Sequence, residues 1–350
     1  MTLRLPMLRF VLATLLALSC TGWAFAQANA DYDNGVTAFQ AGQYAAAAEL
    51  FKRAENALPG KTQALLYEAK CFVHLENLKA AEDALRSYLV SFPNSSDALY
   101  VLGFVLNREN RPSESLRVYT QAAAIVRPTG DDLKIVGLDY VLLDDYTDAI
   151  KWLEKAVELD PSNTDAWYFL GRACYTKGLR DEAWKAFVKV LDLDSHNVKA
   201  KNNIGLILET DGKSEAALDA YRTAITWQEN DLHPNAQPYV NLGNLLMEQG
   251  QIHEAVPALE KAVTLAPNDA YCHMILGAAY RQLGKTEQAQ RELELATQLD
   301  PDNAKAHYQL GRLYKERHDL DRAQEEFKKT DDLKARAARP LSDPANSLSK

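Results

Sequence analysis

Apolar residues recur along most of the chain at two nested spacings. Within short stretches they lie three and four residues apart, which is the spacing of one face of an α-helix. These stretches return every 34 residues when the sequence is written in rows that begin at Ala28. In each row, positions 4, 7, 8 and 11 predict one face of a first helix, and positions 20, 24 and 27 predict one face of a second helix. The nine rows are 28–61, 62–95, 96–129, 130–163, 164–197, 198–231, 236–269, 270–303 and 304–337, with four extra residues at 232–235.

Three columns of these rows keep nearly constant residue types. Position 8 is small, at Gly35, Ala69, Gly103, Gly137, Gly171, Gly205, Gly243, Gly277 and Gly311. Position 20 is Ala in eight rows and Ser115 in the third. Position 24 is large and apolar, at Phe51, Leu85, Tyr119, Leu153, Phe187, Tyr221, Leu259, Leu293 and Phe327. Small residues at positions 8 and 20 let the two helices of a row approach closely, and the large residue fills the space between them.

The ends of the helices are marked by glycine and proline. Position 15 is glycine in five rows, at Gly42, Gly178, Gly212, Gly250 and Gly284. We expect a left-handed backbone conformation there, at the turn between the two helices. Proline at position 32 ends the second helix in several rows, at Pro59, Pro93, Pro161, Pro267 and Pro301.

This pattern resembles the tetratricopeptide repeat. The fifth row carries the most complete set of motif residues, namely Trp167, Leu170, Gly171, Ala183 and Phe187. The resemblance implies an all-α fold, a right-handed superhelical solenoid of antiparallel helix pairs. It also implies a protein that binds proteins or peptides and is not an enzyme. Rows 1 and 2 depart from the motif, because Asn34 and Glu68 replace the leucine of position 7.

The two ends of the chain differ from the repeat. Arg4 and Arg9 precede an apolar stretch over residues 10–18, and Ala24-Phe25-Ala26 has the small-x-small form of a cleavage site. We therefore predict a signal peptide over residues 1–26 and an exported, periplasmic or secreted protein. The alternative is a lipoprotein anchored through Cys20. The last segment, residues 338–350, is rich in Ser, Asp, Pro and Asn, and we predict that it is a disordered tail.

Composition and charge exclude several functions. The net charge of -9 argues against nucleic-acid binding, which favours a basic surface. No apolar run is long enough for an integral membrane segment. Cys71, Cys174 and Cys272 lie three repeats apart, too far for a disulfide, and we expect each to be a buried small apolar residue.

Motifs that suggest cofactors are explained by the repeat. Gly212-Lys213-Ser214 and Gly284-Lys285-Thr286 lack the upstream glycine of a phosphate-binding loop and fall at turns between helices. His273 and His307 occupy position 4 of successive rows, next to Cys272, but a metal site needs more converging ligands. We expect no cofactor, no metal and no catalytic residues.

The resemblance places ligands on the surface formed by the first helices, at positions 2, 5, 6, 9, 12 and 13. Rows 2–5 present mainly apolar residues there, which an apolar or aromatic ligand segment would contact. Rows 6–9 present amides and basic residues, which would hold polar backbone and acidic groups. The predicted binding residues are Tyr67, Tyr100, Val101, Phe104, Leu138, Tyr168, Phe169, Asn202, Asn203, Asn241, Asn244, Arg281, Gln309 and Arg312. The other reading of the apolar set is ordinary packing between neighbouring helices.

The sequence therefore predicts a scaffold in a bacterial-type cell envelope that holds a protein or extended peptide in its groove. Two alternatives remain open: an accessory subunit of an envelope enzyme or secretion complex, and a structural solenoid that self-assembles through its edges or end repeats.

Overall fold

A computed structural model gives the structure of residues 26–57 and 63–338. The predicted signal peptide, except for Ala26, and the predicted tail, except for Ala338, lie outside these described residues. The chain divides into two compact units between Ala186 and Phe187. We call residues 26–186 unit 1 and residues 187–338 unit 2, and each is described by itself.

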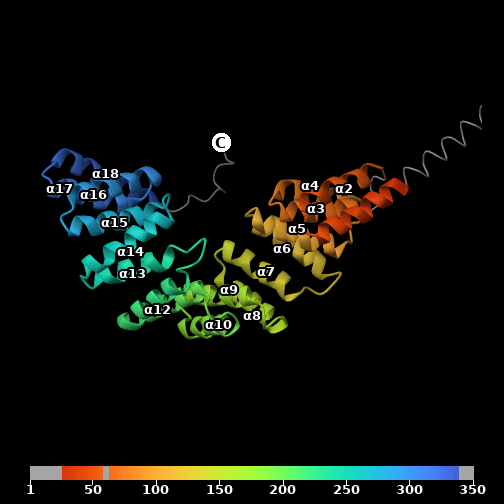
Figure 1. Cartoon of the computed structure of the whole chain (residues 1–350), viewed down its shortest axis with the longest axis horizontal. Helices are drawn as coiled ribbons and strands as arrows, with labels where there is room; N and C mark the ends of the chain where they lie inside the picture. Colours follow the sequence, from red (N-terminus) through yellow and green to blue (C-terminus); the bar gives the residue numbers. More distant parts are fainter. Residues whose placement is uncertain (1–25, 58–62, 339–350) are drawn as a thin grey trace, which may run out of the picture. The chain divides into compact units, whose positions relative to one another are not determined.

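Both units consist of helices, and the described residues contain no strand, so the all-α prediction is confirmed (Figure 1). The helix over residues 26–40 and the odd-numbered helices are the first helices of their rows, and the even-numbered helices are the second. Unit 1 contains, after the helix over 26–40, α2 (Tyr44–Ala57), α3 (Ala64–His74), α4 (Leu78–Ser91), α5 (Ser96–Arg108), α6 (Pro112–Ala123), α7 (Gly130–Leu142), α8 (Tyr146–Leu159) and α9 (Thr164–Thr176). The division between the units falls within α10 (Arg180–Leu193). Unit 2 then contains α11 (Val198–Thr210), α12 (Ser214–Trp227), α13 (Gln237–Glu248), α14 (Ile252–Leu265), α15 (Ala270–Gln282), α16 (Thr286–Leu299), α17 (Ala304–Glu316) and α18 (Leu320–Ala337).

The two helices of a pair come closest where position 8 faces position 24. A Cβ atom added to Gly137 would lie 2.6 Å from Cγ of Leu153, and one added to Gly277 would lie 2.6 Å from Cγ of Leu293. Both leucines are fully buried. Non-bonded carbon atoms pack at about 3.5–4.0 Å, so these leucines fit only because glycine has no side chain. The predicted role of small residues at position 8 is confirmed in these pairs.

Each first helix ends in a left-handed residue at position 15. The five predicted glycines have φ values between 70° and 83°. The same conformation occurs in the four rows without glycine, with φ between 57° and 63° at Glu76, Asn110, Asp144 and His318. The backbone hydrogen bonds are the same in both cases: Asp145 donates its N–H to the carbonyl of Tyr140 at 2.9 Å, as Gln251 does to Leu246 at 2.8 Å. The turn geometry therefore prevails over the steric preference of the residue that occupies it.

Successive pairs are joined by side-chain contacts that span the boundary between rows. A ring nitrogen at position 4 contacts the proline carbonyl near the end of the preceding row, at 2.9 to 3.0 Å. These contacts are Trp167 Nε1 with Pro161 O, His273 Nε2 with Pro267 O and His307 Nε2 with Pro301 O. The side chains of Asn163, Asn197 and Asn303 cap the first helices that follow them. Among the described helices, none combines the length and the apolar character needed to cross a membrane.

The close approach at position 8 leads to a test. Gly277→Ala should destabilise the protein by about 1–3 kcal/mol, because the new methyl group would overlap Leu293 and lie 3.2 Å from the carbonyl oxygen of Ala289. The measurement is the midpoint of urea unfolding, followed by far-ultraviolet circular dichroism. Gln298→Ala, on the exposed surface of α16, is the control and should leave the midpoint unchanged. Equal midpoints for both variants would contradict the assignment of position 8 to the helix contact.

Candidate functional site

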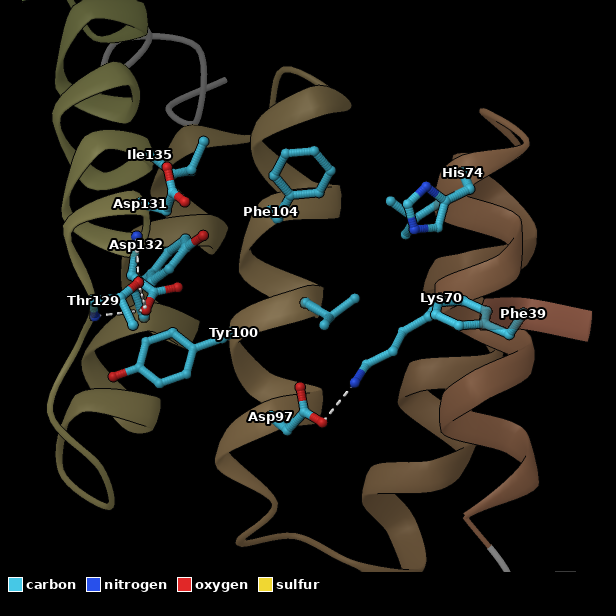
Figure 2. A pocket seen from close by; sticks show the side chains of 13 residues that line it. Phe39, Lys70, His74, Asp97, Tyr100, Phe104, Thr129, Asp131, Asp132 and Ile135 are labelled. Carbon is cyan, nitrogen blue, oxygen red and sulfur yellow. Dashed lines mark hydrogen bonds and ion pairs between the residues drawn. The ribbon is translucent and has the colours of Figure 1, made fainter. Parts of the chain in front are cut away.

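The surface formed by the first helices of unit 1 contains a hollow of about 490 Å³ (Figure 2). It lies over α3, α5 and α7, with contributions from the helix over 26–40 and from α6. Its lining combines apolar and charged side chains. The lining residues are Phe39, Lys70, Val73, His74, Asp97, Tyr100, Val101, Phe104, Tyr119, Thr129, Asp131, Asp132 and Ile135.

Three predicted binding residues, Tyr100, Val101 and Phe104, form the α5 wall of this hollow, and all three are half-buried. The Tyr100 ring packs against Tyr119 with 5.8 Å between ring centroids. Its hydroxyl donates to the carbonyl of Val126 at 2.6 Å, which holds the ring in place. Half-buried aromatic and aliphatic side chains in a hollow of this size can bury an apolar group of a ligand.

One edge of the hollow is acidic, which the sequence interpretation missed. Asp97 lies in the first turn of α5 and Asp131 in the first turn of α7, and both side chains are largely exposed. Asp97 accepts a 2.7 Å bond from Lys70, and Asp131 accepts from Lys134. The bond from Lys134 is the main reason that the pKa of Asp131 is lowered, so the carboxylate is charged at neutral pH.

A third carboxylate of this edge belongs to a helix cap. Asp132 accepts a hydrogen bond from the backbone N–H of Thr129, and the Thr129 hydroxyl accepts one from the N–H of Asp132. This capping box starts α7. Aspartate at position 2 in rows 3 to 5 signals Asp97 and Asp131 in the sequence, but the predicted binding residues include none at that position.

The other four predicted residues of unit 1 do not line the hollow. Tyr67 belongs to an aromatic cluster with Tyr32, Phe39 and Phe51, at centroid distances of 5.3 to 5.9 Å. Leu138 packs against the core around Tyr119. Tyr168 and Phe169 contact each other edge to face, and their rings are half-buried. Ordinary packing accounts for Tyr67 and Leu138.

In unit 2, two of the predicted groove amides are used inside the protein. Asn202 and Asn241 are buried, and Asn241 Nδ2 donates to Asn202 Oδ1 at 2.9 Å. Asn241 Oδ1 also accepts a 2.9 Å bond from Gln237 Nε2, so both amides are engaged within the protein, between α11 and α13. Asn203 donates to the carbonyl of Lys199 in its own helix, and Asn244 donates to the hydroxyl of Tyr271 at 3.2 Å.

Arg281 and Gln309 are held below the surface of α15 and α17. The Arg281 side chain is 7% exposed and its Nη1 lies 2.6 Å from Glu316 Oε1. Two buried atoms, Arg281 Nε and Gln309 Oε1, have no hydrogen-bond partner among the described residues. A buried polar atom without a partner costs roughly 1–3 kcal/mol. The predicted residue Arg312 is exposed.

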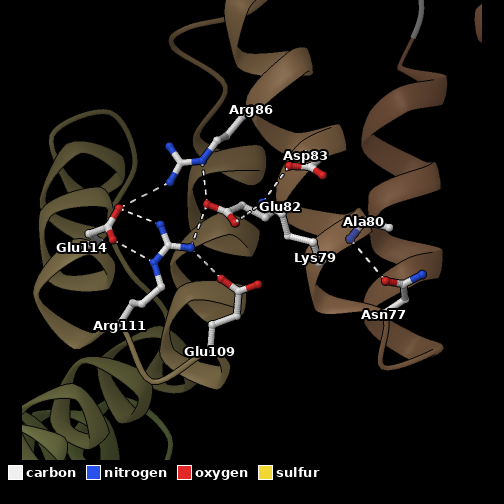
Figure 3. A network of polar contacts seen from close by, with 9 residues as sticks. All are labelled: Asn77, Lys79, Ala80, Glu82, Asp83, Arg86, Glu109, Arg111 and Glu114. Atoms are coloured by element: carbon white, nitrogen blue, oxygen red, sulfur yellow. Dashed lines mark hydrogen bonds and ion pairs between the residues drawn. The ribbon is translucent and has the colours of Figure 1, made fainter.

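An ionic network joins the second and third helix pairs, which contribute α3 and α5 to the lining of the hollow (Figure 3). Buried Glu82 on α4 contacts Arg86 at 2.7 Å and Arg111 at 2.9 Å, and Arg111 also binds Glu109 and Glu114. Burial by itself would raise the pKa of Glu82, but the hydrogen bonds from these cations and Lys79 lower it to about 2. Glu82 lies on α4 of the second pair, and Arg111 directly precedes α6 of the third pair. The network therefore joins these two pairs.

A buried carboxyl group without a cationic contact joins α5, α6 and α7. Asp139 is fully buried, accepts a 2.8 Å bond from Asn107 Nδ2 and lies 2.6 Å from the Ser115 hydroxyl. That hydroxyl is also 2.9 Å from the carbonyl of Gly103. Ser115 has one proton to donate, so both short contacts are satisfied together only when Asp139 is protonated and donates to Ser115. In agreement, burial raises the pKa of Asp139 to about 6.

His273 and His307 are both engaged inside unit 2. His273 Nδ1 lies 2.7 Å from Glu292 Oε2, and His307 Nδ1 lies 2.5 Å from Glu326 Oε2, so each buried ring contacts the second helix of its own pair as well as the proline carbonyl of the preceding pair. No cluster of three or more metal-ligating side chains occurs among the residues that the structure describes. The three cysteines of residues 26–338 are buried and unpaired, as predicted.

Comparison with known families agrees with this architecture. Profiles described as tetratricopeptide repeat match residues 32–96, 164–197, 198–231 and 304–335, and a profile described as TPR repeat matches 137–178, 243–284 and 277–317. The chain belongs to the tetratricopeptide repeat family. The matched segments include α3, but residues 97–136, which carry most of α5 and the acidic edge of the hollow, lie outside them.

Similar proteins of this family share low identity with the chain. Anaphase-promoting complex subunit 3 of Schizosaccharomyces pombe is 21% identical over 71% of this chain and 37% of its own length. BBSome complex member BBS4 of Bos taurus is 26% identical over 70% of this chain and 46% of its own length. The chain thus spans less than half of these curated relatives. The crystal structure of a tetratricopeptide repeat protein from Parabacteroides merdae covers 77% of this chain and 98% of its own, with 18% identity and a TM-score of 0.58, which shows the fold alone.

The buried carboxyl group predicts a pH dependence. Since the pKa of Asp139 is about 6 in the folded chain and its ordinary value is 3.8, the folded state binds the proton more tightly. The stabilisation is complete below pH 3.8 and is lost as the pH rises through 6, with a total on the order of 3 kcal/mol. Asp139→Asn reproduces the protonated arrangement, so it should become more stable than the unsubstituted chain as pH increases.

The measurement is the urea midpoint of both proteins across this pH interval. Asp144→Asn removes the same charge from an exposed turn and is the control, with no pH-dependent difference expected. A difference between Asp139→Asn and the unsubstituted chain that stays constant with pH would show that folding does not raise the pKa of Asp139.

Proposed function

We propose that this chain is a non-catalytic scaffold that holds an extended segment of a partner protein on the first-helix surface of unit 1. The hollow around Tyr100, Val101 and Phe104 is the observation that carries the proposal. It presents half-buried aromatic and aliphatic side chains, which dominate the energy of protein association when they become buried. The Glu82 network joins two of the helix pairs that contribute to the hollow, and the Tyr100–Val126 bond holds the Tyr100 ring.

The relatives support the general class of function. Two of them are components of multiprotein complexes by name, the anaphase-promoting complex and the BBSome. Stacked helix pairs expose long surfaces without a closed cavity, a geometry that suits contacts with other chains. The residues that line the hollow are the basis for the kind of partner that we propose for this chain.

A second contact area is proposed on unit 2, at predicted residues whose side chains remain accessible. They include exposed Arg312 on α17 and partly exposed Asn244 on α13. Arg281 Nε and Gln309 Oε1 are buried and are not part of this area.

The location in the cell envelope is part of the proposal and rests on the sequence of residues 1–26. A positively charged start, an apolar stretch and the Ala24-Phe25-Ala26 site support export. The exported protein should therefore begin at Gln27. Expression of the full chain in a bacterium, fractionation and N-terminal sequencing check this. An intact start, or a lipid on Cys20, would contradict cleavage after Ala26, and Ala24→Arg with Ala26→Arg should block it.

Binding is tested with a phage-displayed library of random linear peptides selected on the purified full chain. The selected peptides should bind Phe104→Ala about tenfold more weakly or worse, because a fully buried Phe side chain contributes roughly 1.5–3 kcal/mol. Fluorescence anisotropy with labelled synthetic peptides measures the change.

Phe92→Ala is the control, since Phe92 is a partly exposed phenylalanine of unit 1 that follows the second helix α4 and does not line the hollow. Thermal melts of both variants verify that they fold. If the peptides bind Phe104→Ala and Phe92→Ala equally well, the hollow is not the binding site.

A further inference from the structure

The acidic edge of the hollow continues along unit 1 as a row of aspartates. Position 2 is Asp97 on α5, Asp131 on α7 and Asp165 on α9, so three successive first helices carry a carboxylate in their first turn. In Figure 2, Asp97 and Asp131 lie on neighbouring helices at the margin of the hollow. Asp165 is exposed on the next first helix. Two of these side chains, Asp97 and Asp131, line the hollow itself.

Helix stability does not explain this row. An acidic residue in the first turn does stabilise a helix through its macrodipole. The first helices of unit 2 form without one, however, because α11, α13, α15 and α17 have no acidic residue in the first turn. Their position-2 residues are Lys199, Gln237, Tyr271 and Lys305. The carboxylates of unit 1 are thus a local property of the surface around the hollow.

We propose that the occupant of the hollow is a partner segment in which a bulky apolar residue is flanked by lysine or arginine. This inference rests on the proposed function and names the chemistry of its partner. The apolar side chain enters between Val101 and Phe104, and the basic residues lie along the aspartates. The charge at the hollow favours this orientation, because the three carboxylates of the lining, Asp97, Asp131 and Asp132, are matched by two lysines, Lys70 in the lining and Lys134 beside Asp131.

The spacing of the aspartates fits an extended chain. Neighbouring packed helices lie about 8–10 Å apart, so carboxylates on successive first helices repeat at about that distance. An extended chain advances about 3.3 Å per residue, and three residues cover about 10 Å. Basic residues three apart in the partner would therefore meet successive aspartates. One of them would compete with Lys70 for Asp97, which is 57% exposed and reachable by a second cation.

The test uses the peptides selected from the random library on the full chain. They should be enriched in lysine or arginine next to Phe, Leu, Trp or Met. The double variant Asp97→Asn with Asp131→Asn should weaken their binding by about three- to tenfold at low salt, the range of a few exposed ion pairs. The loss should disappear at high salt, where such charges are screened. Phe104→Ala should weaken the same peptides at both salt concentrations.

The control removes two carboxylates elsewhere. Asp83→Asn with Asp148→Asn lowers the negative charge equally but on the second helices α4 and α8, and should leave binding unchanged. Peptides that require Phe104 but carry no basic residues, or that bind the Asp97/Asp131 variant normally, would overturn the basic partner and leave the proposed function intact. Peptides that ignore Phe104 would overturn the proposed function and the inference together. Enrichment of acidic peptides would also overturn the basic partner.

Discussion

The close approach of two helices at position 8 is the constraint on which the rest of the structure depends. In most rows, glycine at this position lets the residue at position 24 of the following helix lie against the backbone, as Leu153 does at Gly137. Each pair buries little by itself, and its remaining apolar surface must be covered by the next pair. The short left-handed turn at position 15 follows from this contact, because it brings the second helix back onto the first. That explains why Glu76 and His318 adopt a conformation that glycine favours.

Contacts between pairs vary from row to row, unlike the contact within a pair. The second and third pairs are joined by the ions around Glu82 and Arg111, and the third and fourth by the buried group of Asn107, Ser115 and Asp139. In unit 2, a histidine joins successive pairs: His307 contacts the carbonyl of Pro301 in the preceding pair and the carboxylate of Glu326 in its own pair. Each solution buries polar groups that must be satisfied, and Asp139 has hydrogen-bond partners but no cation beside it. Because burial raises the pKa of Asp139 to about 6, we expect the boundary between the third and fourth pairs to change in stability with pH.

The hollow of unit 1 extends over α3, α5 and α7, and the side chains that line it are different from those that join these helices, such as Asn107 and Asp139. Val73 and Val101 are short, and they leave space between the larger rings of Phe39, Phe104 and Tyr119. The ionic network and the Asp139 cluster hold the surrounding helices through residues that do not line the hollow. A surface with exposed apolar groups can then exist without collapse, because the helices that carry it are positioned by other contacts. In the proposed complex, the hollow accepts an apolar side chain and the aspartates along its margin favour basic residues beside it.

The sequence by itself determined the elements, their register and the family. The spacing of three and four residues reports the geometry of a single helix, and the 34-residue period reports a contact between two helices joined by a short turn. Both patterns arise from contacts between residues close in sequence, so each row shows them independently of the others. The turn glycines and the buried cysteines could be predicted for the same reason.

Only the tertiary structure decided which inward residues remain available to a ligand. Tyr100, Val101 and Phe104 line a hollow, whereas Tyr67 is used in packing and Asn202 is bonded to Asn241. Arg281 was predicted as a surface charge, but Glu316 on the next first helix holds it almost fully buried. Each of these outcomes depends on a partner roughly one row away, such as Asn241 or Glu316. An inward side chain binds a neighbour or a ligand according to the three-dimensional position of that partner, which the periodicity of the sequence does not specify.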